Sequence, residues 1–169
     1  MASASGDGGS GDEERATFFV ERVCPEADHA YRLGFALTLS REGASRCVMG
    51  VFKKLAPECA SLTGLSSEDL RKKVLRMAWE EFHSMRDKYA AEATSIAKFF
   101  ASLSLEGRAA LVIVDVCGMT AAECGEIMAQ GAPQVTGHVS VARRELVKQL
   151  GTDVKRSLLE EADNGPEDA

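Results

Sequence analysis

The sequence predicts an all-α fold, made of two small helical domains joined by a short helical linker. Apolar residues recur at intervals of three and four along most of the chain, and no segment alternates apolar and polar residues as a half-buried strand does. The chain has 169 residues, 45% of them hydrophobic, which is enough for one ordinary domain or two very small ones. We therefore expect a globular helical protein with a buried core.

The charge and hydropathy of the chain limit its partners. The net charge is −6 at pH 7, and acidic residues gather in GDEE near the start and in EEADNGPEDA at the end. The overall field therefore does not attract nucleic acid or an anionic membrane, and any DNA contact has to be local. No apolar run is long enough to span a bilayer, and the start lacks the pattern of a signal peptide. We expect a cytoplasmic protein with no membrane partner and no small-molecule substrate.

Cysteine and acidic residues give little support for an enzyme or a metal site. The 5 cysteines have no Cys-x-x-Cys spacing and are accompanied by only 3 histidines, so reduced, mostly buried thiols are expected. Cys24 with His29 as half of a metal site is the alternative. Glu80, Glu81 and His83 on one helix have no nucleophile, glycine-rich phosphate loop or metal set beside them, and a solvated face explains them better. We expect no enzymatic activity, no cofactor and no metal.

The first helical domain is expected at residues 15–86. It follows a Gly-, Ser- and acid-rich tail at residues 1–14, which we expect to be disordered. Apolar residues at helical spacing predict one helix over residues 31–39 and a second over residues 48–55. The break between these two helices is expected at Ser40–Gly43.

A longer helix is expected to complete the first domain. The stretch from Pro57 onward predicts a loop, and Ser66 or Ser67 is placed to cap a helix that begins near Glu68. Trp79 lies beside the apolar face of this helix. The face itself is formed by Leu70, Val74, Met77, Ala78, Phe82 and Met85.

The linker and the second domain also have helical patterns. The amphipathic segment Tyr89–Leu103 predicts a helical linker over residues 87–103, which is short enough for the two domains to pack together. The second domain is expected at residues 104–150, followed by an acidic tail at 151–169. It opens with a predicted helix over Leu105–Val116, for which the β-branched LVIV run leaves a strand as the alternative.

The second domain continues with the layout of a helix-turn-helix. Gly118 is suited to end the preceding helix, and Thr120 with Glu123 forms a capping box, which predicts a short helix over Ala121–Met128. After a break at AQGAP, Pro133 falls near the first position of a longer helix. Short helix, tight turn and longer helix is the arrangement of many DNA-binding domains. A three-helix packing unit without a DNA role remains the alternative.

The second helix of this unit divides into two faces when it is placed on a helical wheel. The residues expected to face inward are Val135, Val139, Ala142, Leu146 and Leu150. Those expected to face outward are Gly137, Val141, Arg144 and Lys148. The outward face therefore begins with small and apolar residues, and its positive charge lies near the end.

If DNA is bound, five side chains of this helix are the candidates. Arg143 and Arg144 are expected to hold phosphates, and Thr136, His138 and Ser140 are expected to contact base edges.

Segments in both domains carry a resemblance to a known family. The segment AYRLGFALTLSREGASRCVMGVFKKL (Ala30–Leu55) aligns without gaps on a family pattern in which a Leu/Tyr-rich helix precedes Ala-Glu-Asp-Leu-Val-Gln-x-x-Phe. Ser104–Leu146 aligns without gaps on the closing helix-turn-helix, and LRKKVLRMAW (Leu70–Trp79) resembles the later helix of the first domain. Over about Asp28–Leu150 the chain thus resembles the extracytoplasmic-function sigma factors. The positions that match in the helix-turn-helix are Asp115, Gly118, Glu123, Ile127, Val135, Ala142 and Arg143.

The resemblance implies core RNA polymerase and promoter DNA as partners, with an anti-sigma factor as a further one. The chain departs from the family where polymerase is contacted, because Ser45, Arg46 and Met49 replace acid and amide groups. It also has Trp79 and Glu80 where basic and amide groups approach the promoter, and Glu80 is repelled by a polyanion. The residues that we expect to face polymerase or another partner are Arg46, Met49, Lys53, Gly137 and Val141.

Three functions follow as hypotheses. The first is a sigma factor that binds core RNA polymerase and directs it to promoters. The second is a sigma-factor mimic that binds an anti-sigma factor or another transcription protein without reading DNA, which the acidic balance and the exposed pair Gly137 and Val141 favour. The third is a regulator that binds DNA or polymerase without being a sigma factor.

Trp79 either stacks on an unpaired base or is a partly buried core residue, and the second interpretation is favoured.

Overall fold

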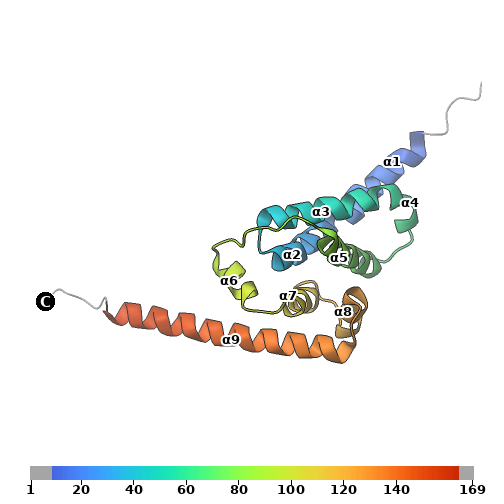
Figure 1. Ribbon diagram of the computed structural model, residues 1–169. Helices are drawn as coiled ribbons and strands as arrows, with labels where there is room; N and C mark the ends of the chain where they lie inside the picture. Colours follow the sequence, from blue (N-terminus) through green and yellow to red (C-terminus); the bar gives the residue numbers. More distant parts are fainter. Residues whose placement is uncertain (1–8, 164–169) are drawn as a thin grey trace, which may run out of the picture.

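Helices α2 and α3 form a tight hairpin at the centre of the N-terminal half (Figure 1). Helix α2 is Ala27–Thr38 and α3 is Arg41–Leu55. Leu39 ends α2 in the left-handed conformation (φ 59°), and the Ser40 side chain caps α3 by accepting from the Gly43 amide at 3.4 Å. The predicted break is thus confirmed. The structure, a computed structural model, describes residues 9–163, and that range contains helices and no strand, which confirms the all-α fold class.

Helix α5 (Ser67–Ser84) lies across the hairpin and completes the N-terminal half. Ser66 caps it by accepting from the Asp69 amide at 3.0 Å, as one of the two predicted caps. The stretch after Pro57 is only partly a loop, because it contains the short helices η3 (Ala56–Glu58) and α4 (Cys59–Leu62). The elements that precede the hairpin are α1 (Gly9–Phe18), η1 (Phe19–Val23) and η2 (Cys24–Glu26).

The linker is helical only in its second part. Residues 85–94 are extended, and α6 (Ser95–Ala101) follows them. The helical prediction fails over the first part because tertiary hydrogen bonds hold the extended backbone: the Glu92 amide donates to the Leu39 carbonyl at 2.9 Å, and the Glu92 carboxylate accepts from the Arg41 amide at 2.7 Å. These hydrogen bonds connect the linker to the turn between α2 and α3.

The C-terminal half consists of α6, α7 (Leu105–Leu111), the π-helical turn η4 (Val112–Val116), α8 (Ala121–Met128) and α9 (Ala132–Asp163). The LVIV run is therefore helical, not a strand. Figure 1 shows α9 as one long helix below α6, α7 and α8 that runs on beyond them. Three of the inward predictions are confirmed, since Val135, Val139 and Ala142 are buried.

The last two inward predictions are wrong. Leu146 is 36% exposed and Leu150 is 55% exposed, because α9 extends past the helices that cover its first half. The same extension continues through the segment expected as a tail from residue 151, up to Asp163. At the other end, α1 begins at Gly9, inside the segment expected to be disordered. Residues 1–8 and 164–169 lie outside the described residues.

The two halves share one hydrophobic core. Helix α2 packs on α7 and η4, and α5 packs on α8, so the buried cluster runs continuously through both halves. Leu70 and Val74 of α5 belong to the same cluster as Ile113 and Ile127 of the C-terminal half. The described structure is therefore a closed arrangement of the two predicted domains. Among the described residues, no helix has the length and apolar character needed to cross a membrane.

Candidate functional site

Local contacts predicted from the sequence hold the unit formed by α8, the following turn and the start of α9. The Thr120 hydroxyl accepts from the Glu123 amide at 3.2 Å, and the Glu123 carboxylate accepts from the Thr120 amide at 2.8 Å, which confirms the capping box. The Thr120 hydroxyl also donates to Glu123 Oε2 at 2.7 Å, and this hydrogen bond, together with the one from the Thr120 amide, holds the pKa of Glu123 below its usual value. Ala129 ends α8 in the left-handed conformation (φ 54°). Gly125 lies against the turn, where an added Cβ would come within 2.6 Å of the Gln130 carbonyl oxygen.

Arg143 is exposed but forms an ion pair with another residue of the chain. Its Nε donates to Asp115 Oδ2 at 2.9 Å and its Nη2 to Asp115 Oδ1 at 2.5 Å, a two-pronged ion pair between α9 and η4. Hydrogen bonding to Asp115 raises the pKa of Arg143 above its ordinary value. The side chain predicted to hold a phosphate therefore has two of its donors committed to the fold.

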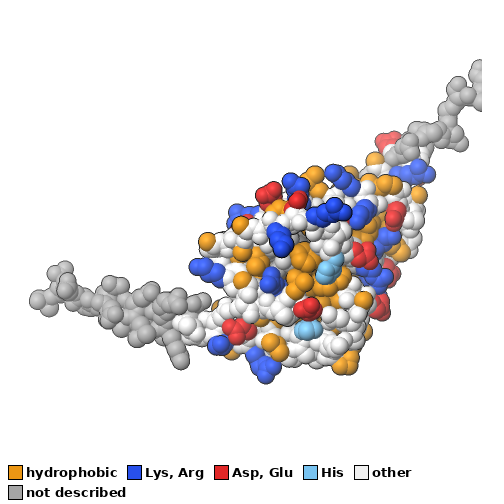
Figure 2. All heavy atoms as spheres, viewed as in Figure 1, with side chains coloured by type: hydrophobic (Ala, Val, Ile, Leu, Met, Phe, Trp, Pro, Cys, Tyr) orange, Lys and Arg blue, Asp and Glu red, His pale blue; other side chains and the backbone are white. Residues whose placement is uncertain are grey.

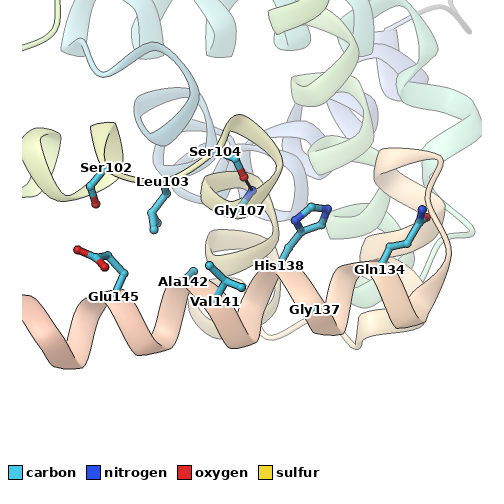
Figure 3. A pocket seen from close by; sticks show the side chains of 10 residues that line it. All are labelled: Ser102, Leu103, Ser104, Gly107, Gln134, Gly137, His138, Val141, Ala142 and Glu145. Carbon is cyan, nitrogen blue, oxygen red and sulfur yellow. Dashed lines mark hydrogen bonds between the residues drawn. The ribbon is translucent and has the colours of Figure 1, made fainter.

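The other four predicted DNA contacts lie on two different sides of α9. Thr136, Ser140 and Arg144 are exposed, although the Thr136 hydroxyl donates to the Ala132 carbonyl at 3.0 Å and Arg144 Nε donates to the Ser140 carbonyl at 3.3 Å. His138 is half-buried and points toward α7 (Figure 3). Of the two arginines, Arg143 is thus paired with a carboxylate, whereas Arg144 donates to a backbone carbonyl of its own helix.

A groove of about 500 Å³ runs between the first half of α9 and the α6–α7 corner (Figure 3). We call it the α9 groove. Gly137 and Val141, both predicted to face a partner, line it beside His138. Val141 is 55% exposed, and no atom lies within 4 Å of where a Gly137 Cβ would be. The remaining lining residues are Ser102, Leu103, Ser104, Gly107, Gln134, Ala142 and Glu145.

The three partner-facing residues predicted on α3 share an exposed face. Met49 is 57% exposed, and Lys53 is exposed one helical turn further on. The Arg46 side chain lies 3.9 Å from Glu42 and 3.5 Å from Asp87 of the linker. This face is therefore exposed, and the Asp87 carboxylate of the linker neutralises part of the positive charge of Arg46.

A second groove crosses the boundary between the two halves. This interdomain groove, of about 390 Å³, is lined mainly by residues of α2 in the N-terminal half and of α6 and η4 in the C-terminal half. Ile96 and Val116 are 61% and 44% exposed in it, unusual values for large apolar side chains that lie together. Arg32 and Arg41 also line it. The other apolar residues of the lining are Tyr31, Phe35, Phe100 and Val112.

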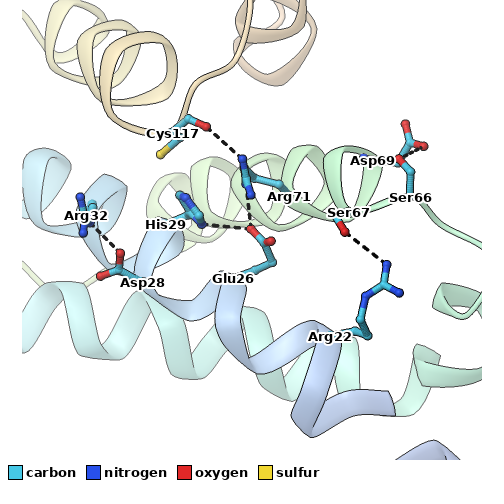
Figure 4. Close-up of polar contacts among 10 residues, drawn as sticks. All are labelled: Arg22, Glu26, Asp28, His29, Arg32, Ser66, Ser67, Asp69, Arg71 and Cys117. Atoms are coloured by element: carbon cyan, nitrogen blue, oxygen red, sulfur yellow. Dashed lines mark hydrogen bonds and ion pairs between the residues drawn. The ribbon is translucent and has the colours of Figure 1, made fainter.

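A buried carboxylate positions an arginine that links the two halves of the protein (Figure 4). Glu26, at the start of α2 and 6% exposed, accepts from Arg71 Nε of α5 at 3.1 Å. Nη1 of Arg71 also donates to the Cys117 carbonyl at 3.4 Å, and Cys117 follows Val116 of the groove directly. His29 Nδ1 lies 3.0 Å from the same Glu26 oxygen, so His29 is placed by this carboxylate and not by Cys24.

The residues considered for catalysis or metal binding have structural partners. Glu81 accepts from Lys54 Nζ at 2.7 Å, a hydrogen bond that raises the pKa of Lys54. His83 packs edge-on against Trp79 with ring centroids 4.4 Å apart, and Trp79 is half-buried beside the core, as favoured. Within the part of the chain that the structure describes, no three potential metal ligands come together. Burial raises the pKa of three thiols to about 12, those of Cys47, Cys117 and Cys124.

Sequence reasoning missed the interdomain groove and the Glu26–Arg71 pair. Glu26 and Arg71 are 45 positions apart, and the groove combines residues of α2 with residues of α6 and η4, so neither set has a local pattern.

Comparison with known proteins identifies a similar fold. No protein-family model matches the chain, and no curated protein matches its sequence. A solved structure, described as the sigma factor RpoE in complex with the anti-sigma factor NepR from Bartonella quintana, is similar over 80% of this chain and 98% of that one. The TM-score is 0.65 and the sequence identity 16%, so the likeness is one of fold. The chain therefore has a sigma-factor-like fold.

Proposed function

We propose that this chain is a transcription regulator with a sigma-factor fold that binds a helical protein of the anti-sigma class in the interdomain groove. The observation that carries the proposal is the apolar groove between the two halves, in which Ile96 and Val116 are exposed in the free protein. Support for the class of partner comes from the similar sigma factor, whose structure is described as a complex with an anti-sigma factor.

The chemistry of the groove suits an amphipathic helix. A helix that inserts apolar side chains three and four positions apart would bury Ile96 and Val116 against the aromatic rings of Tyr31 and Phe35. Arg41, whose side chain is 74% exposed, lies at the groove 3.4 Å from Glu92, and an acidic residue of such a helix would compete with Glu92 for it. The preferred partner is thus an apolar helix with acidic flanks.

Electrostatics makes DNA the less favoured first partner. Asp115 occupies Arg143, and Glu145 lies one residue beyond Arg144 and pairs with Lys148 at 3.6 Å. Phosphate affinity grows with the number of free cations at the contact, and the first half of α9 offers few of them. The surface at which a helix-turn-helix ordinarily meets DNA is therefore weakly basic here, in a chain whose net charge is −6.

The test is binding to purified anti-sigma factors encoded in the same genome, measured by isothermal titration calorimetry. Ile96→Asp and Val116→Asp should each weaken binding by about 10-fold or more, because each removes an apolar side chain worth about 1.5–3 kcal/mol on burial. Val147→Asp is the matched control, since Val147 is 70% exposed on α9 outside the groove. Binding that the two groove variants leave intact, or that Val147→Asp weakens equally, would contradict the proposal.

The second candidate is a sigma factor that binds core RNA polymerase and promoter DNA. The exposed face of α3 with Met49 and Lys53 favours it, as do the exposed Thr136 and Ser140 of α9. Its test is stoichiometric capture of purified core polymerase followed by transcription in vitro from genomic fragments. New start sites, lost in Met49→Asp, would establish it.

A further inference from the structure

Helix α9 runs on beyond the helices that cover its first half (Figure 1). We call residues 147–163 of this helix the α9 extension. At 1.5 Å per residue the extension is about 25 Å long. Val147 is 70% exposed and Leu150 is 55% exposed, so the extension begins with large apolar side chains in contact with water. Helices in proteins derive most of their stability from the packing of an apolar face, so a surface that covers these side chains would stabilise the extension.

The sequence of the α9 extension has the pattern of an apolar helix with an acidic end. Val154 and Leu158 follow Leu150 at intervals of four, the spacing of one helical face. Glu161, seven positions after Val154, continues this face, whereas the basic pair at 155–156 falls outside it. The extension therefore has the same pattern as the partner that the interdomain groove prefers.

The interdomain groove complements such a helix mainly through apolar contact. Ile96 and Val116 are exposed in it, and Arg41 at its rim lies 3.4 Å from Glu92, with which an incoming carboxylate would compete. On the face shown in Figure 2, cationic and acidic side chains are interspersed over the N-terminal half. Burial of apolar surface therefore has to supply most of the attraction, and Arg41 orients the bound helix.

We propose that the α9 extension of a second copy of this chain docks in the interdomain groove. Leu150 and the apolar residues that follow it at helical spacing would cover Ile96 and Val116, and the acidic end of the helix would lie toward Arg41. The contact joins two different surfaces, and each chain has one of each. It therefore either repeats from head to tail or closes into a two-fold dimer in which the extensions are exchanged.

The α9 extension of the same chain does not reach its own groove without a break in the helix. Gln149 Nε2 donates to the Ser102 hydroxyl at 3.1 Å, which holds α9 against the end of α6, and α9 then continues as one helix to Asp163. Figure 1 shows this part of α9 running away from α2, which lines the groove. A second copy needs no such break, because two chains of the described shape can dock as rigid bodies.

Self-association would regulate access to the groove, a consequence that rests on the proposed function. An anti-sigma helix and the α9 extension would occupy the same groove and exclude each other. The protein partner would therefore dissociate the assembly, and its apparent affinity would fall as the concentration of this chain rises.

Sedimentation velocity of the full chain over a range of concentrations tests the contact without any protein partner. The wild type should shift from monomer to larger species as the concentration rises. Ile96→Asp in the groove and Leu150→Asp on the extension should each weaken self-association about 10-fold or more. Val141→Asp is the matched control, because Val141 is on the same helix, has the same 55% exposure as Leu150 and lies outside both surfaces. A wild type that stays monomeric would overturn the proposal, as would equal weakening by Val141→Asp.

A mixture of the two defective variants identifies the surfaces that meet. Ile96→Asp keeps an intact extension and Leu150→Asp keeps an intact groove, so an equimolar mixture should form a 1:1 dimer that neither variant forms alone. Self-association of Ile96→Asp alone at the wild-type level would mean that two extensions pair with each other, and would overturn the proposal. A mixture that stays monomeric would also overturn it.

The sedimentation experiment and the titration with an anti-sigma factor fail independently. Thermal unfolding followed by circular dichroism checks that both substitutions, which are at exposed positions, leave the fold intact. A monomeric wild type that binds an anti-sigma factor in the groove would overturn only the contact between copies. Self-association through the groove without binding of any anti-sigma factor would overturn only the proposed function.

Discussion

Gly137, within the second turn of α9, should be replaceable by alanine with a gain in stability. Glycine in a helix interior costs about 0.8–1.0 kcal/mol relative to alanine. A Cβ at Gly137 would meet no atom within 4 Å, so no clash offsets this gain. With an unfolding entropy of about 2.1 cal/mol/K per residue over 169 residues, 1 kcal/mol corresponds to a rise of about 3 °C in Tm.

Gly118→Ala is the matched control, because the substitution is the same and a Cβ there also meets nothing within 4 Å. The backbone conformation determines whether the substitution raises or lowers the stability. Gly118 has φ +74°, a left-handed conformation that costs an alanine roughly 1–2 kcal/mol. Differential scanning calorimetry of the two variants should therefore show Tm shifts of opposite sign. A Gly137→Ala variant that is neutral or less stable, or two shifts of the same sign, would refute the reasoning from backbone conformation and open space.

Three further outcomes are expected. Thr120→Ala should lower the free energy of unfolding by about 1 kcal/mol, measured by denaturant titration, because it removes the cap of α8; no change would show that the capping box does not stabilise the fold. The lowered pKa of Glu123 contributes stability above the unfolded-state pKa that is lost as the pH falls through the lower folded-state value, so the difference in unfolding free energy between wild type and Glu123→Gln should shrink in acid; a difference that grows in acid would contradict this sign. A thiol reagent at pH 8 should modify the exposed Cys24 rapidly in the native protein. It should modify Cys47, Cys117 and Cys124 only on unfolding, because burial raises the pKa of these thiols to about 12. Rapid modification of any of these three in the native protein would contradict the packed core.

The helix-turn-helix unit could be predicted from the sequence because its determinants are local. The hydroxyl of Thr120 and the carboxylate of Glu123 act within one turn, and Gly118 supplies the left-handed residue directly before them. The burial of Val135 and Val139 likewise follows from helical spacing, since the helices that cover them adjoin them in the chain.

Features that depend on distant contacts escaped prediction. The extended backbone at Glu92 is set by hydrogen bonds to the α2–α3 corner, which no propensity of residues 85–94 indicates. Leu146 and Leu150 are exposed because the covering helices end before them, and a helical wheel contains no information on where a neighbour ends. The pair of Arg143 with Asp115 spans 28 positions, so the sequence predicted a phosphate contact for a side chain whose donors Asp115 already accepts.

The candidate interfaces likewise divide into those that depend on local sequence patterns and those that depend on distant contacts. The exposed residues predicted on α3 and α9 lie at the surface as helical periodicity requires, and their roles remain predictions. The interdomain groove exists only because two halves that are separate in sequence share a core. It depends on the packing of the two halves, on which the proposed function is based.

Amide hydrogen exchange of the full chain, measured with an anti-sigma factor and then with core RNA polymerase, shows directly whether the interdomain groove binds the protein partner. We expect the anti-sigma factor to slow exchange in α2, α6 and η4, which line the groove. Protection confined to the exposed face of α3 and the first half of α9, obtained with core polymerase and absent from the groove with any anti-sigma factor, would contradict it.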